Sequence, residues 1–249
     1  MKSSRRTIVK SMFAAATVTS MPLAWAADVV KIGYVSPQTG PLAPFGEADK
    51  WVIEQMKVAF KDGITIAGKK HEVQIILKDS QSNPNRAGEV ANDLILKDKV
   101  SLLLTAGTPE TSNPVSDVAE LNEIPCISSV VPWQPWFFGR KGDPAKGFNW
   151  TYHIFWGLED VIANFTNGWK SVQTNKKVGG LFPNDGDGNA WGDKELGFPK
   201  PLSQMGFTLT DPGRFQMAHK TSVPKSLHSK KRVLKLSLVW LFRQMPKLS

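Results

Sequence analysis

The sequence V-V-K-I-G-Y-V-S-P-Q-T-G-P-L-A-P-F-G-E-A-D-K-W-V-I-E-Q-M-K-V-A-F, from Val29 to Phe60, combines three structural signals in direct succession. Its first seven residues form an apolar run with β-branched side chains, which predicts a buried strand. A loop follows over 36–46 and holds two glycines and three prolines. Residues 47–60 mix apolar and charged side chains as an amphipathic helix does. Because parallel α/β sheets bind ligands at the carboxyl ends of their strands, this loop, with Thr39 and Phe45, lies where a ligand can be held.

The same order repeats along the chain. Further strands are predicted at 71–77, 100–104 and 124–129, and helices at 83–97 and 108–122. Asn83 and Pro84 fit a helix N-cap and first turn. The alternation predicts an α/β fold with a mostly parallel sheet and helices on both faces.

The formal charge of +9 is concentrated at the two ends of the chain. Residues 1–26 hold four basic side chains and no acid, and residues 219–249 hold eight and no acid. Removing these 12 from the 31 basic residues leaves 19 against 22 acids, a net charge of −3 for the body. The body is therefore mildly acidic, which argues against a nucleic-acid partner. Cys126 is the single cysteine, so no intrachain disulfide is possible.

Residues 1–26 have the features of an export signal. Ser4 to Lys10 reads S-R-R-T-I-V-K, a twin-arginine pattern, and a short apolar stretch follows. An ordinary Sec signal with an accidental arginine pair is the alternative. Ala24-Trp25-Ala26 is an A-x-A cleavage site, so we expect cleavage after Ala26 and delivery to the periplasm by either route.

Three segments together resemble one family. The first is S-x-x-T-G-P-x-A-x-F-G at 36–46; the others are T-A-G-T-P-E-T-S-N-P-V-S-D at 105–117 and I-P-C-I-S-S-V-V-P at 124–132. In this order they resemble the leucine/isoleucine/valine-binding proteins of ABC importers. The resemblance implies two Rossmann-like lobes, the type I periplasmic binding protein fold. It also implies a monomer that binds a small ligand between its lobes and delivers it to the importer's membrane subunits, with no catalysis and no cofactor.

The resemblance also implies which residues contact the ligand. They are Thr108 and Thr111 after the third predicted strand, Ser128, Ser129 and Val130 after the fourth, and Trp191 in the second lobe. A helix N-terminus at Thr108 presents unpaired N–H groups to a carboxylate. Pro109 has no N–H and removes one of these donors, which weakens the case for an amino-acid carboxylate. Alternatively, Thr108 only caps its helix.

The run P-W-Q-P-W-F-F at 132–138 is unusually aromatic. Its rings, Trp133 first among them, are candidates to stack on a planar ligand or to line an apolar pocket. The alternative is a surface loop that packs its own rings against the domain.

We place the boundary between the lobes near Trp150, which gives a first lobe at 27–150 and a partial second lobe at 151–218. In the second lobe, helices are predicted at 159–169 and 191–205, and strands at 177–182 and 207–209. The segment D-G-D-G-N at 185–189 superficially fits a calcium loop. However, Ala190 and Leu196 occupy the positions of the required glycine and glutamate, so we expect a polar turn and no metal site.

Residues 219–249 differ from the rest, with no acid, no glycine and no clear strand–helix order. At face value this basic tail is a segment that touches membrane or nucleic acid. Our preferred hypothesis is a reading-frame shift near Ala218, after which the tail is translated out of frame and the second lobe stays incomplete.

The leading interpretation is a periplasmic solute-binding protein for a small amino-acid-like, aromatic or organic-acid ligand. The alternatives are a sensory ligand-binding domain, or a non-functional fragment of such a binding protein. The sequence contains no G-x-S-x-G, P-loop, G-x-G-x-x-G or paired His/Cys metal spacing, so an enzyme is not expected. His71 and His153 are interpreted as packing or surface residues.

Overall fold

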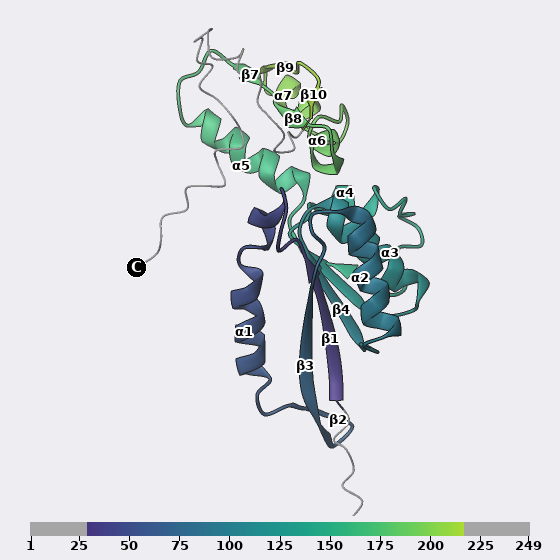
Figure 1. Cartoon of the computed structure of the whole chain (residues 1–249). Helices are drawn as coiled ribbons and strands as arrows, with labels where there is room; N and C mark the ends of the chain where they lie inside the picture. The colour runs from purple at the N-terminus through teal and green to yellow at the C-terminus, as the bar shows by residue number, and fades with distance from the viewer. Residues whose placement is uncertain (1–28, 217–249) are drawn as a thin grey trace, which may run out of the picture.

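The computed structural model describes residues 29–216, and its largest element is a six-stranded sheet (Figure 1). The strands are β1 (Val29–Ser36), β2 (Ile64–Ile66), β3 (Lys69–Asp79), β4 (Leu102–Ala106), β5 (Cys126–Ser129) and β6 (Thr151–His153). Their spatial order is β2-β3-β1-β4-β5-β6. Neighbouring strands are parallel except β2 and β3, which form an antiparallel hairpin. The predicted α/β class with a mostly parallel sheet is confirmed.

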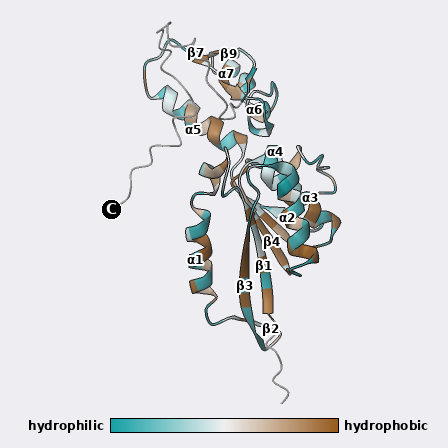
Figure 2. Cartoon of the chain, in the orientation of Figure 1, coloured by the Kyte–Doolittle hydropathy of each residue, from teal (hydrophilic) through white to brown (hydrophobic). Residues whose placement is uncertain are grey.

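Helices cover both faces of this sheet, as the sequence predicts. The short 3₁₀ helix η1 (Ala43–Gly46) leads into α1 (Asp49–Ala59), which lies on one face, while α2 (Pro84–Leu96) and α3 (Pro109–Leu121) lie together on the other (Figure 1). These helices enclose strands such as β3 and β4, which are coloured as largely hydrophobic (Figure 2). Leu94, Leu103 and Val115 are fully buried on the α2/α3 face. On the α1 face, Ile53 packs with Tyr34.

Local signals explain where α2 and α3 begin. The side chain of Asn83 accepts a hydrogen bond from the N–H of Arg86 at 3.0 Å, and Pro84 occupies the first turn, so this predicted cap is present. Thr108 holds the N-cap position of α3, but its side chain makes no capping hydrogen bond. The predicted N-cap position of Thr108 is therefore present, without a capping hydrogen bond from its side chain.

The aromatic run at 132–138 is a short helix, α4 (Trp133–Phe137), and not a surface loop. Trp136 is buried, and its ring stacks on His153 with the centroids 4.9 Å apart. Its indole N–H donates to Ser116 Oγ at 3.2 Å. Rings of this run therefore attach α4 to α3 and β6. The predicted surface loop describes only the two ends of the run.

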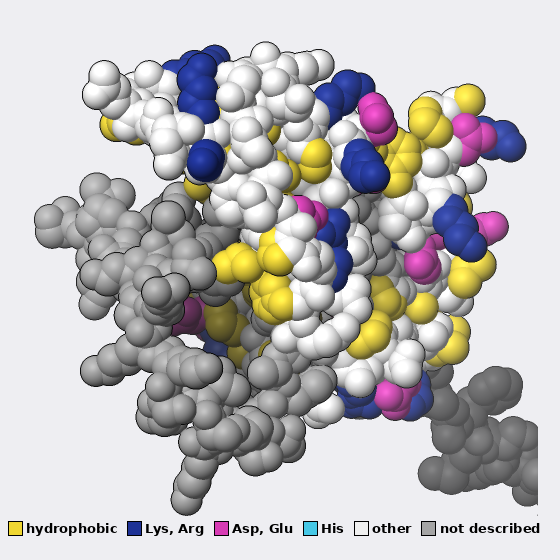
Figure 3. Space-filling view, turned by 90° about the horizontal axis from the view of Figure 1, so that it is seen from above, with side chains coloured by type: hydrophobic (Ala, Val, Ile, Leu, Met, Phe, Trp, Pro, Cys, Tyr) yellow, Lys and Arg dark blue, Asp and Glu magenta, His cyan; other side chains and the backbone are white. Residues whose placement is uncertain are grey.

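Residues 29–153 are called the first unit below. A second unit follows over residues 158–216. Its elements are α5 (Leu158–Lys170), β7 (Lys177–Gly179), β8 (Phe182–Pro183), α6 (Gly186–Trp191), α7 (Pro199–Gln204), β9 (Thr208–Thr210) and β10 (Arg214–Phe215). The strands form two parallel pairs, β7 with β9 and β8 with β10. Leu158, Phe198 and Leu202 are buried in its core. Seen from above, hydrophobic, basic and acidic side chains are interspersed on the surface (Figure 3).

Three predictions for the second unit were wrong in detail. The expected helix over 191–205 is two helices, because α6 ends at Trp191 and α7 begins only at Pro199. Asp193 Oδ1 accepts the N–H groups of Glu195 and Leu196 and holds a turn between them. The expected strand over 177–182 is split at Gly179–Gly180 into β7 and β8. The polar stretch from Asp185 is not a turn, because it opens α6.

Two further features concern the expected boundaries. Strand β6 lies just beyond residue 150 and pairs with β5 in the sheet of the first unit. The predicted signal peptide at 1–26 and the basic tail at 219–249 lie outside the described residues. Over residues 29–216, the helices are all too short or too polar to cross a membrane.

Candidate functional site

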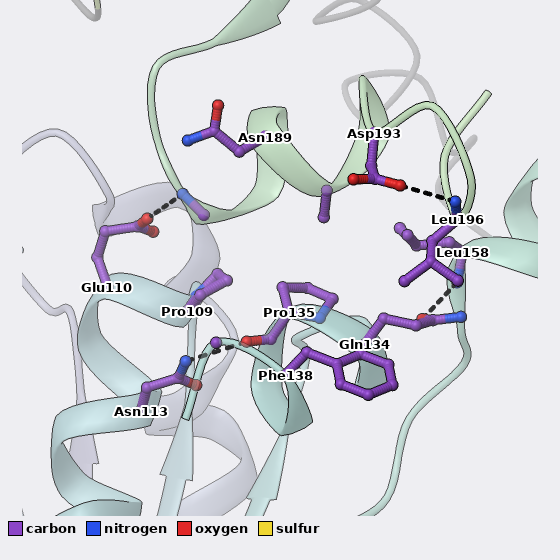
Figure 4. A pocket seen from close by; sticks show the side chains of 13 residues that line it. Pro109, Glu110, Asn113, Gln134, Pro135, Phe138, Leu158, Asn189, Asp193 and Leu196 are labelled. Carbon is purple, nitrogen blue, oxygen red and sulfur yellow. Dashed lines mark hydrogen bonds between the residues drawn. The ribbon is translucent and has the colours of Figure 1, made fainter. Parts of the chain in front are cut away.

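A pocket of about 440 Å³ lies between the two units (Figure 4). The first unit contributes residues of α3, of α4 and of the turn after α4; the second contributes the start of α5, α6 and the turn after α6. The lining residues are Pro109, Glu110, Asn113, Gln134, Pro135, Phe138, Gly139, Leu158, Gly186, Asn189, Ala190, Asp193 and Leu196.

The floor of the pocket is apolar and rigid. Pro109 is the first residue of α3, and Pro135 and Phe138 come from α4 and its end. The chain reaches α4 from β5 through Val130, whose φ of 72° is left-handed, an unfavourable region for a β-branched residue. Val131, directly after it, is fully buried and anchors this bend.

One side wall is a hydrogen-bonded clamp between α4 and α5. Gln134 Oε1 accepts the N–H of Leu158 at 2.9 Å, and Gln134 Nε2 donates to Glu159 Oε2. The indole N–H of Trp133 donates to Glu159 Oε1 at 2.8 Å. Burial opposes ionisation of Glu159, but these hydrogen bonds outweigh it and lower its pKa. The clamp keeps an ionised carboxylate directly behind the pocket wall.

The opposite wall is where the two units touch. Glu110 Oε1 accepts the N–H of Gly186 at 2.6 Å, across 76 residues of chain. A Cβ on Gly186 would lie 3.0 Å from Pro109 Cβ and 3.1 Å from Glu110 Oε1, so glycine allows this close approach. Asp185 caps α6, because its Oδ1 accepts the N–H of Gly188 at 2.7 Å.

Two carboxyl groups at the start of α6 lie close to Glu110 on this side of the pocket. Burial, followed by the neighbouring charges of Glu110 and Asp185, raises the pKa of Asp187 to about 8. Burial also raises the pKa of Asp185, against the hydrogen bond from Gly188, and Glu110 adds to this rise. Asp187 Oδ1 is buried without a hydrogen-bond partner among the described residues. A carboxylate in this setting resists ionisation near neutral pH.

None of the nine residues predicted from the sequence lines this pocket, although Thr108, Thr111, Trp133 and Trp191 are next to lining residues in the chain or one turn away. Strand pairing brings the ends of β1, β4 and β5 to one edge of the sheet, with Val35 beside Thr105 and Thr105 beside Ser128. Thr39 therefore shares an edge with Thr108. Thr39 is exposed, and its hydroxyl donates to Asp79 Oδ2 at 2.6 Å.

The remaining predicted residues differ in how accessible they are. Phe45 and Trp133 are 44% and 37% exposed, and Ser129, Val130 and Trp191 are half-buried. Thr108 and Thr111 are buried on either side of the lining residues Pro109 and Glu110. The Thr108 hydroxyl has no hydrogen-bond partner among residues 29–216.

Ser128 is turned away from solvent toward a buried histidine. It is fully buried, and its Oγ lies 2.8 Å from His153 Nδ1 and 3.2 Å from the carbonyl of Tyr152. His153 Nε2 lies 2.8 Å from the carbonyl of Val131, so Nε2 carries the proton and Nδ1 accepts from Ser128. Burial lowers the pKa of His153. The interpretation of His153 as a packing residue is confirmed.

Sequence reasoning missed the polar residues that line the pocket. Glu110 sits in the first turn of α3, where an acidic residue is common for its effect on the helix dipole, but its carboxylate reaches the second unit. Gln134 was hidden inside an aromatic run, and Asp193 inside a stretch predicted as one helix. Within the part of the chain that the structure describes, no group of three or more His, Cys, Asp or Glu side chains is arranged to hold a metal ion.

Solved structures with the same fold include three binding proteins. A solute-binding protein of an ABC transporter from Rhodopseudomonas palustris BisB5, in complex with 3,4-dihydroxybenzoic acid, is 23% identical with a TM-score of 0.57, covering 76% of this chain and 47% of that one. A solute-binding protein from R. palustris in complex with 4-hydroxybenzoate is 18% identical with a TM-score of 0.61, covering 78% and 49%. A leucine-binding protein from Thermotoga maritima is 20% identical with a TM-score of 0.59, covering 77% and 50%.

The chain spans about half the length of these proteins, and at such identities the likeness shows a shared fold. No curated protein sequence gives a significant match. The sequence profile described as periplasmic binding protein matches residues 29–229, which is most of the chain. With its parallel sheet, its second unit and the pocket between them, this chain belongs to the periplasmic binding protein family.

Proposed function

We propose that the chain is the solute-binding component of an ABC importer and holds a small solute in the pocket between its two units. The observation that carries this proposal is the pocket itself, about 440 Å³ in volume and built from both units. Its volume falls within the range of about 300–1,000 Å³ that is typical of small-molecule sites. Binding alone is required, so the protein catalyses no reaction.

The contact between the units supports such a role. The two units are joined on one side of the pocket by the hydrogen bond between Glu110 and Gly186, and on the other by the hydrogen bonds of Gln134 to α5. A solute that touches both units adds contacts that exist only when they are together. It therefore stabilises their closed arrangement by a free energy that grows with the logarithm of its concentration once this exceeds its Kd.

Thr108 remains the strongest of the predicted ligand contacts. Its hydroxyl is buried without a partner, and it directly precedes Pro109 in the pocket floor. A buried hydroxyl without a hydrogen bond is costly, and a ligand group that satisfies it gains that energy. Thr39, Phe45, Thr111, Ser128, Ser129, Val130, Trp133 and Trp191 do not line the pocket, and we propose that they support the cleft from outside its lining. We further propose that residues 1–26 direct export to the periplasm, where the monomer meets the importer's membrane subunits.

The test is a thermal-shift screen of the full chain against amino acids, aromatic acids and amines, followed by calorimetry on each hit. Ala190→Leu places a larger side chain in the pocket, so we expect it to abolish binding of any hit. The control is Ala163→Leu, the same substitution at an exposed position of α5 outside the pocket, which should bind normally. A hit that binds equally well to both variants would refute the pocket as the site.

A further inference from the structure

Two of the three amide side chains that line the pocket each donate a hydrogen bond to the protein itself. Asn113 Nδ2 donates to the carbonyl of Pro135 at 3.1 Å, and Gln134 Nε2 donates to Glu159 (Figure 4). Asn189 carries the remaining amide, but it is exposed and its side chain points away from the pocket floor (Figure 4). A ligand that needs hydrogen-bond donors from the pocket finds few.

The two helix N-termini beside the pocket are also occupied. At α3, Pro109 has no N–H, and the N–H groups of Thr111 and Ser112 bond to the carbonyl of Thr108. At α6, the N–H of Gly186 goes to Glu110. The N–H of Gly188 goes to Asp185. Several of the N–H groups that usually bind a ligand's carboxylate at helix ends are therefore engaged within the protein.

Acceptors, in contrast, remain available. Asn113 Oδ1 is buried without a partner among the described residues, and its orientation is set because Pro135 needs the donor end of the amide. Glu110 and Asp193 each bring a carboxylate into the lining and use one oxygen in hydrogen bonds to backbone N–H groups. Asp193 lies across the pocket from Glu110 (Figure 4).

The charged side chains that line the pocket are all acidic. None of the described residues that line it is Lys, Arg or His. The carboxylate of Glu159 is hydrogen-bonded to Gln134, and the carboxyl groups of Asp185 and Asp187 lie near Glu110. Arg214 donates to Asn189 Oδ1 at the rim, but its guanidinium is paired with Asp211 at 3.0 Å.

We infer that this pocket takes a solute with a protonated amine on an apolar body and discriminates against a free carboxylate. The inference rests on the proposed function and names its solute class. The ammonium group satisfies Asn113 Oδ1 and a carboxylate of Glu110 or Asp193, and the apolar body lies on Pro109, Pro135 and Phe138. A carboxylate in the same place meets the like charges of Glu110 and Asp193, which costs binding energy.

The raised pKa values of Asp185 and Asp187 agree with this assignment. Burial is the first cause in both cases, and the charge of Glu110 contributes in both. A cation bound beside Glu110 offsets this repulsion, so its binding should favour ionised carboxylates and release protons.

The experiment uses three probes of similar size on the full chain: 2-phenylethylamine, phenylacetate and the neutral 2-phenylethanol. Thermal shift and calorimetry should show the amine binding at least about tenfold more tightly than either of the others. Raising the salt concentration should weaken binding of the amine.

Two conservative variants locate the charge. Glu110→Gln and Asp193→Asn keep acceptors for their backbone partners but remove the charges, so at least one should weaken amine binding by about tenfold. Glu89→Gln, an exposed change on α2 outside the pocket, should leave it unaltered. Tighter binding of phenylacetate, or amine binding that is unchanged in both pocket variants, overturns the amine inference. If that phenylacetate binding is lost in Ala190→Leu, the proposed function stands. If no probe and no screened solute binds, both fail.

Discussion

Glu110 Oε1 and the backbone N–H of Gly186 form a hydrogen bond of 2.6 Å that joins α3 of the first unit to α6 of the second. The contact depends on the absence of a side chain at Gly186, because a Cβ there would crowd Pro109 and Glu110. The spacing between the units, and with it the shape of the pocket, is therefore sensitive to a single methyl group.

Gly186→Ala should separate the two units locally. We expect a loss of about 1–3 kcal/mol in the free energy of unfolding, which is typical of overpacking, together with weaker binding of any pocket ligand. The matched control is Gly168→Ala on α5, where an added Cβ meets nothing within 4 Å. That change should be neutral or slightly stabilising, since alanine favours helix over glycine. Urea denaturation of both variants checks the prediction, and equal effects would contradict it.

Asp187 should make the protein less stable as the pH rises. Its pKa of about 8 in the folded state lies above the ordinary value of 3.8, so the folded state binds more protons than the unfolded state between these values. The stabilising contribution is present below about pH 4 and is lost as the pH rises through about 8.

Asp187→Asn should remove this dependence and leave the variant more stable than the parent above pH 8. Denaturation midpoints measured from pH 4 to pH 9 test it, with the exposed Asp62→Asn as a control that should follow the parent. A variant profile parallel to that of the parent would count against the assignment.

His153 should have the opposite effect at acidic pH. Its pKa is lowered by burial, so the unfolded state binds the proton more readily, and stability is lost as the pH falls below about 6.5. His153→Phe preserves an aromatic ring against Trp136 but leaves the carbonyl of Val131 without this partner. We expect a loss of about 1–3 kcal/mol at pH 8 and a smaller dependence on pH between 5 and 7. The control Tyr152→Phe removes the exposed hydroxyl of the preceding residue. It should change neither the free energy of unfolding nor its dependence on pH much. Parent-like pH dependence in His153→Phe would contradict this account.

Arg140 connects the loop after α4 to α3 and β6. Its side chain is 1% exposed; it pairs with Asp117 at 2.6 Å, donates to Thr151 Oγ1 at 3.0 Å and lies 3.9 Å from the ring centroid of Phe148. Arg140→Met should lower the free energy of unfolding by about 3 kcal/mol, because several contacts are lost together.

Asp117→Asn should cost less than Arg140→Met, about 1 kcal/mol, because Asp117 is half exposed while the arginine keeps its other contacts. Urea denaturation of the two variants gives the comparison. A larger loss for Asp117→Asn would show that the ion pair, and not the packing of the guanidinium, dominates.

Regular elements of the first unit could be predicted because their signals are local. The apolar run at Val29–Val35 and the cap at Asn83 depend on residues a few positions apart, and β1 and α2 form where these signals lie. The helix at α4 was not predicted, because its five residues are too few to show a helical period. The break between α6 and α7 depends on Asp193 turning back to its own backbone, which hydrophobic periodicity does not report.

Hydrophobic periodicity, caps and the three quoted motifs were enough to predict the α/β class, the order of elements and the family. They also predicted that Thr108 would lie near a binding region, since strand order brings parallel strand ends to one edge. The pocket itself depends on contacts between distant positions, such as Glu110 with Gly186 and Gln134 with Glu159. These pairs depend on how two folded units meet, and that meeting is set by side-chain volumes and backbone approach across the interface, not by spacing along the chain.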